Sequence, residues 1–174
     1  MVIILDDEGF ETQMLNKIAD FFNEKSQEHL TIYLHSDGGR IAILDAILDL
    51  INSNPERFTL IGFNKLASCA FELYIKANCN KRLLNGTFGM YHLGYGSVNY
   101  NEKMQAVTRF DDALIKRKTE LYYPQTKQFM SQCEFTAEEE QVVAEGKDLW
   151  IQTDRFIEME RVFKKNQINE AKII

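Results

Sequence analysis

The sequence predicts an α/β fold with a largely parallel sheet, and two observations lead to this prediction. First, short apolar runs alternate through the first half of the chain with stretches whose apolar residues recur at helical spacing. Such alternation is typical of crossover βαβ units. Second, the pair Gly38-Gly39 stands between an apolar run and a helical pattern, where a tight strand-to-helix turn is expected.

Three apolar or β-branched runs are expected as strands, and three segments with apolar residues at spacings of three and four are expected as helices. In chain order these are strand 2–5, helix 11–25, strand 30–34, helix 41–51, strand 58–62 and helix 68–77. The α/β class rests on this half of the chain.

The second half is expected to differ. Two short strands, at 83–84 and 90–93, are expected on either side of a turn at Asn85-Gly86. A long helical region follows at about 101–132. Pro124 is expected to kink this helix or to end it one residue earlier, because proline lacks the amide that a helix interior needs.

The C-terminal part carries capping signals. Thr136 and Glu139 fit a capping box that starts a short helix, and Gly146 is expected to close it. The apolar triplet 149–151 follows, and Thr153 is expected to cap a last helix.

The composition limits the class of protein. The chain has 174 residues, two prolines and no Ser/Gly-rich stretch, so a single domain spanning 1–174 is expected. The net charge of −6 disfavours nucleic acid and anionic membranes as partners, because both select a basic face. No apolar run approaches the roughly 18 residues that cross a bilayer, and no signal peptide is evident. Three cysteines without metal-type spacing favour a reducing compartment, so a cytoplasmic protein is expected.

Four positions could carry chemistry, and each also has an ordinary structural interpretation. The amides of Gly38-Gly39 could hold an anion, or the pair could only make a turn. Ser68 could be a nucleophile or an N-cap. His92 could be a base or a structural histidine. Asp148 could orient a base or only begin a turn. From the residues alone these alternatives stay open.

The order of these segments resembles the Clp peptidase family. Residues 33–41 resemble its strand-to-helix motif, which contains Asn-Ser-Pro-Gly-Gly, and residues 67–70, Ala-Ser-Cys-Ala, resemble its Ala-Ser-Met-Gly segment. The interval between the glycines and the serine equals that of the family. Lys81-Arg82 falls at the family's Lys-Arg pair. Met90-Tyr91-His92 matches its Met-Ile-His, and Asp148-Leu149-Trp150 takes the place of its Asp with two bulky residues. The resemblance covers roughly residues 2–156.

The resemblance implies a ClpP/crotonase-like fold, built of repeated ββα units with largely parallel sheets and a projecting handle helix in the region of about 94–132. It implies a serine endopeptidase that hydrolyses peptide bonds by acyl-enzyme chemistry within a self-compartmentalising homo-oligomer of one or two rings. Peptides or unfolded proteins would be the substrates. Such chemistry needs no metal or organic cofactor.

The resemblance also implies a role for each matched residue. Ser68 would be the nucleophile, His92 its general base and later the acid, and Asp148 the group that orients the imidazole. The backbone amides of Gly39 and Cys69 would form the oxyanion hole.

The chain departs from the family pattern at several positions. Ala70 replaces a glycine, and His35 and Asp37 replace the asparagine and proline of the motif, which brings titratable groups near the proposed oxyanion hole. Because extra residues separate His92 from Asp148, Asp154 is the second candidate for the third member.

The match starts at the family's first core strand, so the axial hairpin that meets the unfoldase is not expected. This argues against a Clp ATPase partner, although the family has one. Two other functions remain open: a ring-forming structural subunit without activity, and an acyl-CoA enzyme of the crotonase type, which shares the fold.

Overall fold

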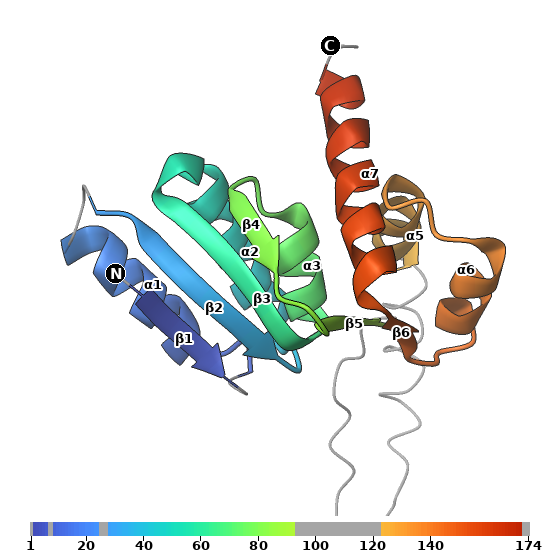
Figure 1. Ribbon diagram of the computed structural model, residues 1–174, viewed down its shortest axis with the longest axis horizontal. Helices are drawn as coiled ribbons and strands as arrows, with labels where there is room; N and C mark the ends of the chain where they lie inside the picture. The colour runs from blue at the N-terminus through green and yellow to red at the C-terminus, as the bar shows by residue number, and fades with distance from the viewer. Residues whose placement is uncertain (1, 7–8, 25–27, 93–122, 172–174) are drawn as a thin grey trace, which may run out of the picture.

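The computed structural model describes residues 2–6, 9–24, 28–92 and 123–171, and its centre is one sheet (Figure 1). Within the described residues this sheet has six strands, and β4 pairs with β3 beside the path formed by the other five. In chain order the strands are β1 (Val2–Asp6), β2 (Leu30–Ser36), β3 (Phe58–Ala67), β4 (Asn80–Leu83), β5 (Phe88–Tyr91) and β6 (Leu149–Ile151).

The helices form two groups. In Figure 1, α1, α2 and α3 pack behind β1, β2 and β3, whereas α5, α6 and α7 gather beside β5 and β6. Their bounds are α1 (Thr12–Glu24), α2 (Ile41–Asn52), α3 (Cys69–Lys76), α5 (Tyr123–Gln132), α6 (Ala137–Ala144) and α7 (Thr153–Ala171), with a 3₁₀ turn η1 (Pro55–Arg57) before β3.

The strand pairing confirms the predicted α/β class. The neighbours β1–β2, β2–β3, β3–β4 and β3–β5 are parallel, and β5–β6 is antiparallel. Along β2 the side chains of Leu30, Ile32 and Leu34 are fully buried, while Thr31 and Tyr33 are half-buried. This alternation is expected of strands that have helices on one face.

The third strand is longer than the sequence predicted and changes partner along its length. Its first half pairs with β4 and its second half with β5. Against β2, the register moves from Leu34 opposite Gly62 to Ser36 opposite Leu66, so β3 contains a bulge. A bulge changes the direction of a strand without ending it. The extra length brings the chain to Ala67, next to Ser68.

An aromatic cluster joins the two helix groups. The ring of Phe71 on α3 lies 4.6 Å from that of Phe156 on α7, and the ring of Tyr91 lies 5.2 Å from that of Phe129 on α5. A Cβ at Gly89 would lie 2.7 Å from the Phe71 ring, so only glycine allows β5 to approach α3 this closely. Burial of these rings stabilises the contact between the first and second halves of the chain.

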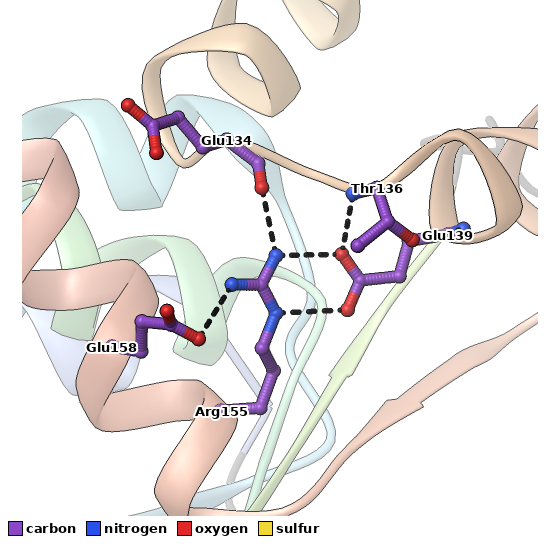
Figure 2. A network of polar contacts seen from close by, with 5 residues as sticks. All are labelled: Glu134, Thr136, Glu139, Arg155 and Glu158. Atoms are coloured by element: carbon purple, nitrogen blue, oxygen red, sulfur yellow. Dashed lines mark hydrogen bonds and ion pairs between the residues drawn. The ribbon is translucent and has the colours of Figure 1, made fainter.

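A polar network joins α6 to α7 (Figure 2). Thr136 and Glu139 form the predicted capping box at the start of α6, at 2.9 and 3.2 Å. The Glu139 carboxylate also accepts two hydrogen bonds from Arg155, at 2.9 and 2.8 Å. Arg155 donates further to the carbonyl of Glu134 and to Glu158. A bidentate arginine–carboxylate pair fixes the relative orientation of its two side chains, so this pair holds α6 against the start of α7.

Lys81 on β4 holds the end of α3. Its ammonium donates to the carbonyls of Tyr74 and Ile75 at 2.8 and 3.0 Å and lies 3.3 Å from Glu160 on α7. These carbonyls belong to the last turn of the helix, where a cation is favourable. Burial lowers the pKa of Lys81 to about 8, so this ammonium depends on its partners to stay charged.

Most of the predicted elements are confirmed, with differences in detail. The two short strands of the second half exist, but each pairs with β3 and not with the other. The hydroxyl of Thr153 donates to the carbonyl of Thr87 at 2.5 Å, which ties α7 to the sheet. Pro124 lies within the first turn of α5, where its missing amide is tolerated. Of the handle predicted at about 94–132, residues 94–122 lie outside the described residues, and residues 123–132 form α5.

No helix in the described ranges has both the length and the apolar character needed to cross a membrane. All three cysteines are free and buried. Burial raises the pKa of the Cys69 and Cys79 thiols to about 11 and that of Cys133 to about 12.

We expect the native protein to protect all three thiols from Ellman's reagent at pH 8, and the urea-unfolded chain to react at all three.

The raised thiol pKa values also predict a pH dependence. Between about pH 8.5, where an unfolded cysteine ionises, and pH 12, the native Cys133 keeps a proton that the unfolded chain has lost. Its contribution to stability is therefore lost as the pH rises.

Above pH 8 the lowered pKa of Lys81 makes the folded protein more stable as the pH rises, which opposes the effect of the Cys133 thiol. The effect of the thiol is therefore measured as a difference in stability between two proteins. The free energy of unfolding of the wild type minus that of Cys133→Ala should be constant below pH 8 and shrink above it. A difference that stays constant up to pH 11 would contradict the assignment.

Candidate active site

Three chain segments meet where β3, β5 and β6 come together, and the strand register explains how. The last parallel pair of β3 and β5 is Ala67 with Met90, and the Ser68 amide donates to the Met90 carbonyl at 2.8 Å. The pair of β5 and β6 at this end is Tyr91 with Leu149. Ser68 directly follows Ala67, and His92 directly follows Tyr91. Asp148 directly precedes Leu149, because β6 runs antiparallel to β5.

Ser68 lies at the turn between β3 and α3 in an unusual backbone conformation. Its φ is 53° and its ψ is −120°, a region that non-glycine residues rarely occupy. It is the residue before the first turn of α3, yet its side chain makes no capping hydrogen bond. Its Oγ lies instead 2.9 Å from Nε2 of His92. The N-cap alternative is therefore excluded for this hydroxyl.

His92 links this serine to an acid. Its Nδ1 lies 3.3 Å from a carboxylate oxygen of Asp148, on the side of the ring opposite to Ser68. The carboxylate can only accept, so it favours the tautomer with hydrogen on Nδ1. The lone pair on Nε2 is then directed at the serine hydroxyl. The imidazole is 21% exposed, so the ring is shielded but open to a substrate.

Asp154, the second candidate for the acid, lies in the first turn of α7. Among the contacts of the described residues, the carboxylate placed against the His92 ring is that of Asp148. The long interval between His92 and Asp148 in the sequence is occupied in part by α5 and α6, which do not disturb the β5–β6 register.

The glycine pair is held between two neighbours. Phe10 forms a parallel bridge with Gly39: its amide donates to the Gly38 carbonyl at 2.8 Å, and its own carbonyl accepts from Arg40 at 3.1 Å. A Cβ at Gly39 would lie 2.5 Å from the Phe10 nitrogen. At Gly38, where φ is +95°, a Cβ would lie 2.7 Å from the Cβ of Ser68. No side chain larger than hydrogen fits at either position.

Two backbone amides, those of Gly39 and Cys69, belong to segments that meet at the serine turn. A parallel bridge uses the peptide groups that flank Gly39, which leaves its own amide unbonded to Phe10. Cys69 begins α3, where helical amides have no partner within the helix. In the described part of the chain, no backbone carbonyl accepts from either amide. The Cys69 thiol donates to the Gly39 carbonyl at 3.2 Å and holds the two segments together.

The residues that replace the family's asparagine and proline contact the β3 bulge. His35 is buried, with its ring 5.4 Å from that of Phe63 and its Nε2 3.3 Å from the Asn64 amide nitrogen. Asp37 forms an ion pair with Lys65. Between them, the buried Ser36 hydroxyl accepts from the Gly38 amide at 3.1 Å. These contacts hold the turn at Gly38-Gly39 against the β3 bulge.

The arrangement has a definite chemical capacity. A serine hydroxyl beside a correctly oriented imidazole can lose its proton and attack a carbonyl carbon. Backbone amides that have no carbonyl partner can bind the negative charge that develops on a substrate carbonyl oxygen.

Comparisons with known proteins identify the family and the fold. The model of the Clp protease family matches residues 4–147. The chain belongs to the Clp protease family. A solved structure of a ClpP1 mutant from Listeria monocytogenes is similar in fold, with a TM-score of 0.65 and 16% sequence identity over 91% of this chain and 86% of that chain. No curated protein sequence matches the chain.

The comparisons therefore confirm the predicted family and the predicted ClpP-like α/β fold. Two contributors to the site were missed. Phe10 was outside every motif, although its place between a strand and a helix of the apolar pattern could have suggested a packing role. Ser36 was part of the motif, but no sequence signal assigned its hydroxyl to the Gly38 amide.

The strained backbone of Ser68 leads to a stability prediction. Glycine adopts this φ without a steric penalty, so Ser68→Gly should be more stable than Ser68→Ala by about 1 kcal/mol. Urea unfolding of the two variants measures the difference. Ser53 is the matched control, because its φ is −76° and its ψ is −16°. There the order should reverse, with Ser53→Ala the more stable. Equal stability of the two Ser68 variants would refute strain at this position.

Proposed function

We propose that this chain is a serine endopeptidase that cleaves peptide bonds through an acyl-enzyme on Ser68. The observation that carries the proposal is the continuous contact from Ser68 Oγ to His92 Nε2 at 2.9 Å, and from His92 Nδ1 to Asp148 at 3.3 Å. Membership of the Clp protease family supports the same reaction class.

In the first half of the reaction, His92 Nε2 takes the hydroxyl proton as the Ser68 oxygen attacks the carbonyl carbon of a peptide. Asp148 stabilises the imidazolium that forms and keeps the ring in place. The amides of Gly39 and Cys69 donate to the oxyanion of the tetrahedral intermediate. His92 then gives its proton to the amine, which leaves, and the acyl group stays on Ser68.

In the second half, a water molecule loses a proton to His92 and attacks the ester carbon. The same two amides hold the second oxyanion. The proton returns to the Ser68 oxygen as the bond breaks, and a carboxylic acid is released. The scheme uses polar groups of the chain and one water molecule, and it calls for no cofactor.

The family model and the fold also support a homo-oligomer of ring type that encloses the sites and takes peptides or unfolded chains. Large apolar side chains stand exposed on several elements, including Val2 and Ile4 on β1, at 57% and 63%. Exposure of this kind is typical of surfaces that an assembly covers.

A fluorophosphonate probe tests the proposed nucleophile, because it reacts with a serine only when the hydroxyl is activated. We expect one label per chain, on Ser68, in the wild type and none in Ser68→Ala. His92→Ala should lose more than about 99% of the labelling rate, and Asp148→Asn should lose a comparable share, because each removes part of the base.

Ser131→Ala, on α5, is the matched control and should label as the wild type does. Absence of labelling in a folded wild-type protein would refute the peptidase and favour a structural subunit. Labelling with thioester hydrolysis but no peptide cleavage would favour an acyl-CoA enzyme of the same fold.

Assembly is a separate prediction. Sedimentation at working concentration should give a particle several times the 20.3 kDa of one chain. Ile4→Lys should shift the distribution toward smaller species, because a charge cannot be buried unpaired in an apolar contact. A stable monomer that cleaves peptides at the full rate would contradict the self-compartmentalising arrangement.

A further inference from the structure

The side chain of Cys69 has no part in the proposed reaction, which uses only the amide of this residue. The thiol is nevertheless buried, with 3% of the residue exposed, and its sulfur lies 3.2 Å from the carbonyl oxygen of Gly39. In the family segment that residues 67–70 resemble, the corresponding residue is methionine, whose sulfur has no proton to donate. The hydrogen bond is therefore a feature of this chain and does not follow from the family motif.

The contacts of Phe10 fix the direction of both peptide groups that flank Gly39. In a planar trans peptide the N–H and the C=O point in opposite directions. The Gly38 carbonyl accepts from the Phe10 amide at 2.8 Å, so the Gly39 amide points away from Phe10. The Arg40 amide donates to the Phe10 carbonyl at 3.1 Å, so the Gly39 carbonyl also points away from Phe10. The amide and the carbonyl of Gly39 therefore lie on the same side of the chain.

The Cys69 thiol lies on that side. It donates to the Gly39 carbonyl, which brings the first residue of α3 next to the glycine whose amide is proposed to bind the oxyanion. The two segments are in direct contact, because a Cβ at Gly38 would lie 2.9 Å from the Cys69 nitrogen. The two residues proposed to form the oxyanion hole are thus joined by the side chain of one of them.

The thiol keeps the proton that this hydrogen bond requires. Burial is the main cause that raises the pKa of the Cys69 thiol to about 11, and the negative charge of Glu72 acts in the same direction. At neutral pH the side chain is therefore an uncharged donor. It places no negative charge beside an oxyanion that develops on a substrate.

The glycine turn lacks a restraint that the family motif has. In the motif a proline directly precedes the glycine pair, whereas this chain has Asp37. Proline fixes its own φ, and an aspartate leaves that torsion free to vary. The two glycines add conformational freedom of their own. Hydrogen bonds from neighbouring segments must then hold the turn, and the one from Cys69 reaches Gly39 itself.

We infer that Cys69 is a positioning residue for the proposed peptidase reaction: its thiol holds the Gly39 carbonyl and thereby sets the position of the Gly39 amide in the oxyanion hole. The inference rests on the proposed function. Donors stabilise an oxyanion at about 2.7–3.1 Å, so a small displacement of one amide weakens binding of the transition state. Binding of the substrate before reaction does not depend on that distance to the same degree.

Fluorophosphonate labelling of Ser68 measures this role, because the phosphonyl oxygen of the probe gains negative charge as the serine attacks phosphorus. The labelling rate at saturating probe and the probe concentration that gives half this rate are measured separately. Cys69→Ala and Cys69→Val both lack a donor, and valine is close to cysteine in volume. Each should lower the saturating rate about tenfold and change the half-saturating concentration by less than about twofold.

Cys69→Ser separates positioning from packing. Serine is close to alanine in volume but keeps an O–H donor, so it should restore the saturating rate to within about threefold of the wild type. A thiol that only filled space would be replaced no better by serine than by alanine, because a buried hydroxyl without a partner is unfavourable. Cys133 is the matched control, since it is also buried, and its alanine and serine variants should both label as the wild type does.

The outcomes separate the inference from the function on which it rests. Equal saturating rates for Cys69→Ala and Cys69→Ser, or a wild-type rate for Cys69→Val, would overturn the positioning role and leave the peptidase standing. A change confined to the half-saturating concentration would overturn it too, because it would assign Cys69 to probe binding. Absence of labelling in the folded wild-type protein would remove both the peptidase and the inference. Urea unfolding establishes that each variant is folded, and two donor-free variants keep the comparison available if one of them does not fold.

Discussion

The antiparallel pairing of β6 with β5 is the interaction on which the site depends. Strand β5 pairs with β3 on one side and with β6 on the other, so its end lies between Ser68 and Asp148. Because backbone hydrogen bonds set the register residue by residue, His92 meets both neighbours within 3.3 Å without any long-range adjustment of side chains. A shift of one residue in β6 would turn Asp148 to the other face of the sheet.

Such a short strand needs support from outside, since three residues of ladder do little to define register on their own. The aromatic cluster supports the pairing of β5 with β6 by packing, because Phe156 of α7 lies on Phe71 of α3 and Gly89 allows β5 to lie against them. The Arg155–Glu139 pair also supports β6, because it joins α6 and α7, the helices before and after this strand in the chain. Apolar burial thus provides stability, and the ionic network provides orientation.

Much of the fold could be predicted because its signals are local. Helical spacing marked α1 and α2, the Thr136–Glu139 box marked α6, and alternating strands and helices gave the α/β class. The extension of β3 to Ala67 was not predictable, because it depends on a bulge and on a change of partner from β4 to β5. For the same reason the two short strands of the second half pair with β3, which no turn signal at Asn85-Gly86 could reveal.

For the site, residue order and spacing were enough to nominate Ser68, His92, Asp148 and the glycine turn, because a family motif is carried by local sequence. Two features required the folded chain: the contact of the Asp148 carboxylate with the His92 ring, and the bridge from Phe10 to Gly39. Each joins segments that lie far apart in the sequence. Contacts of that kind follow from strand register and core packing, which are properties of the whole chain and not of any one segment.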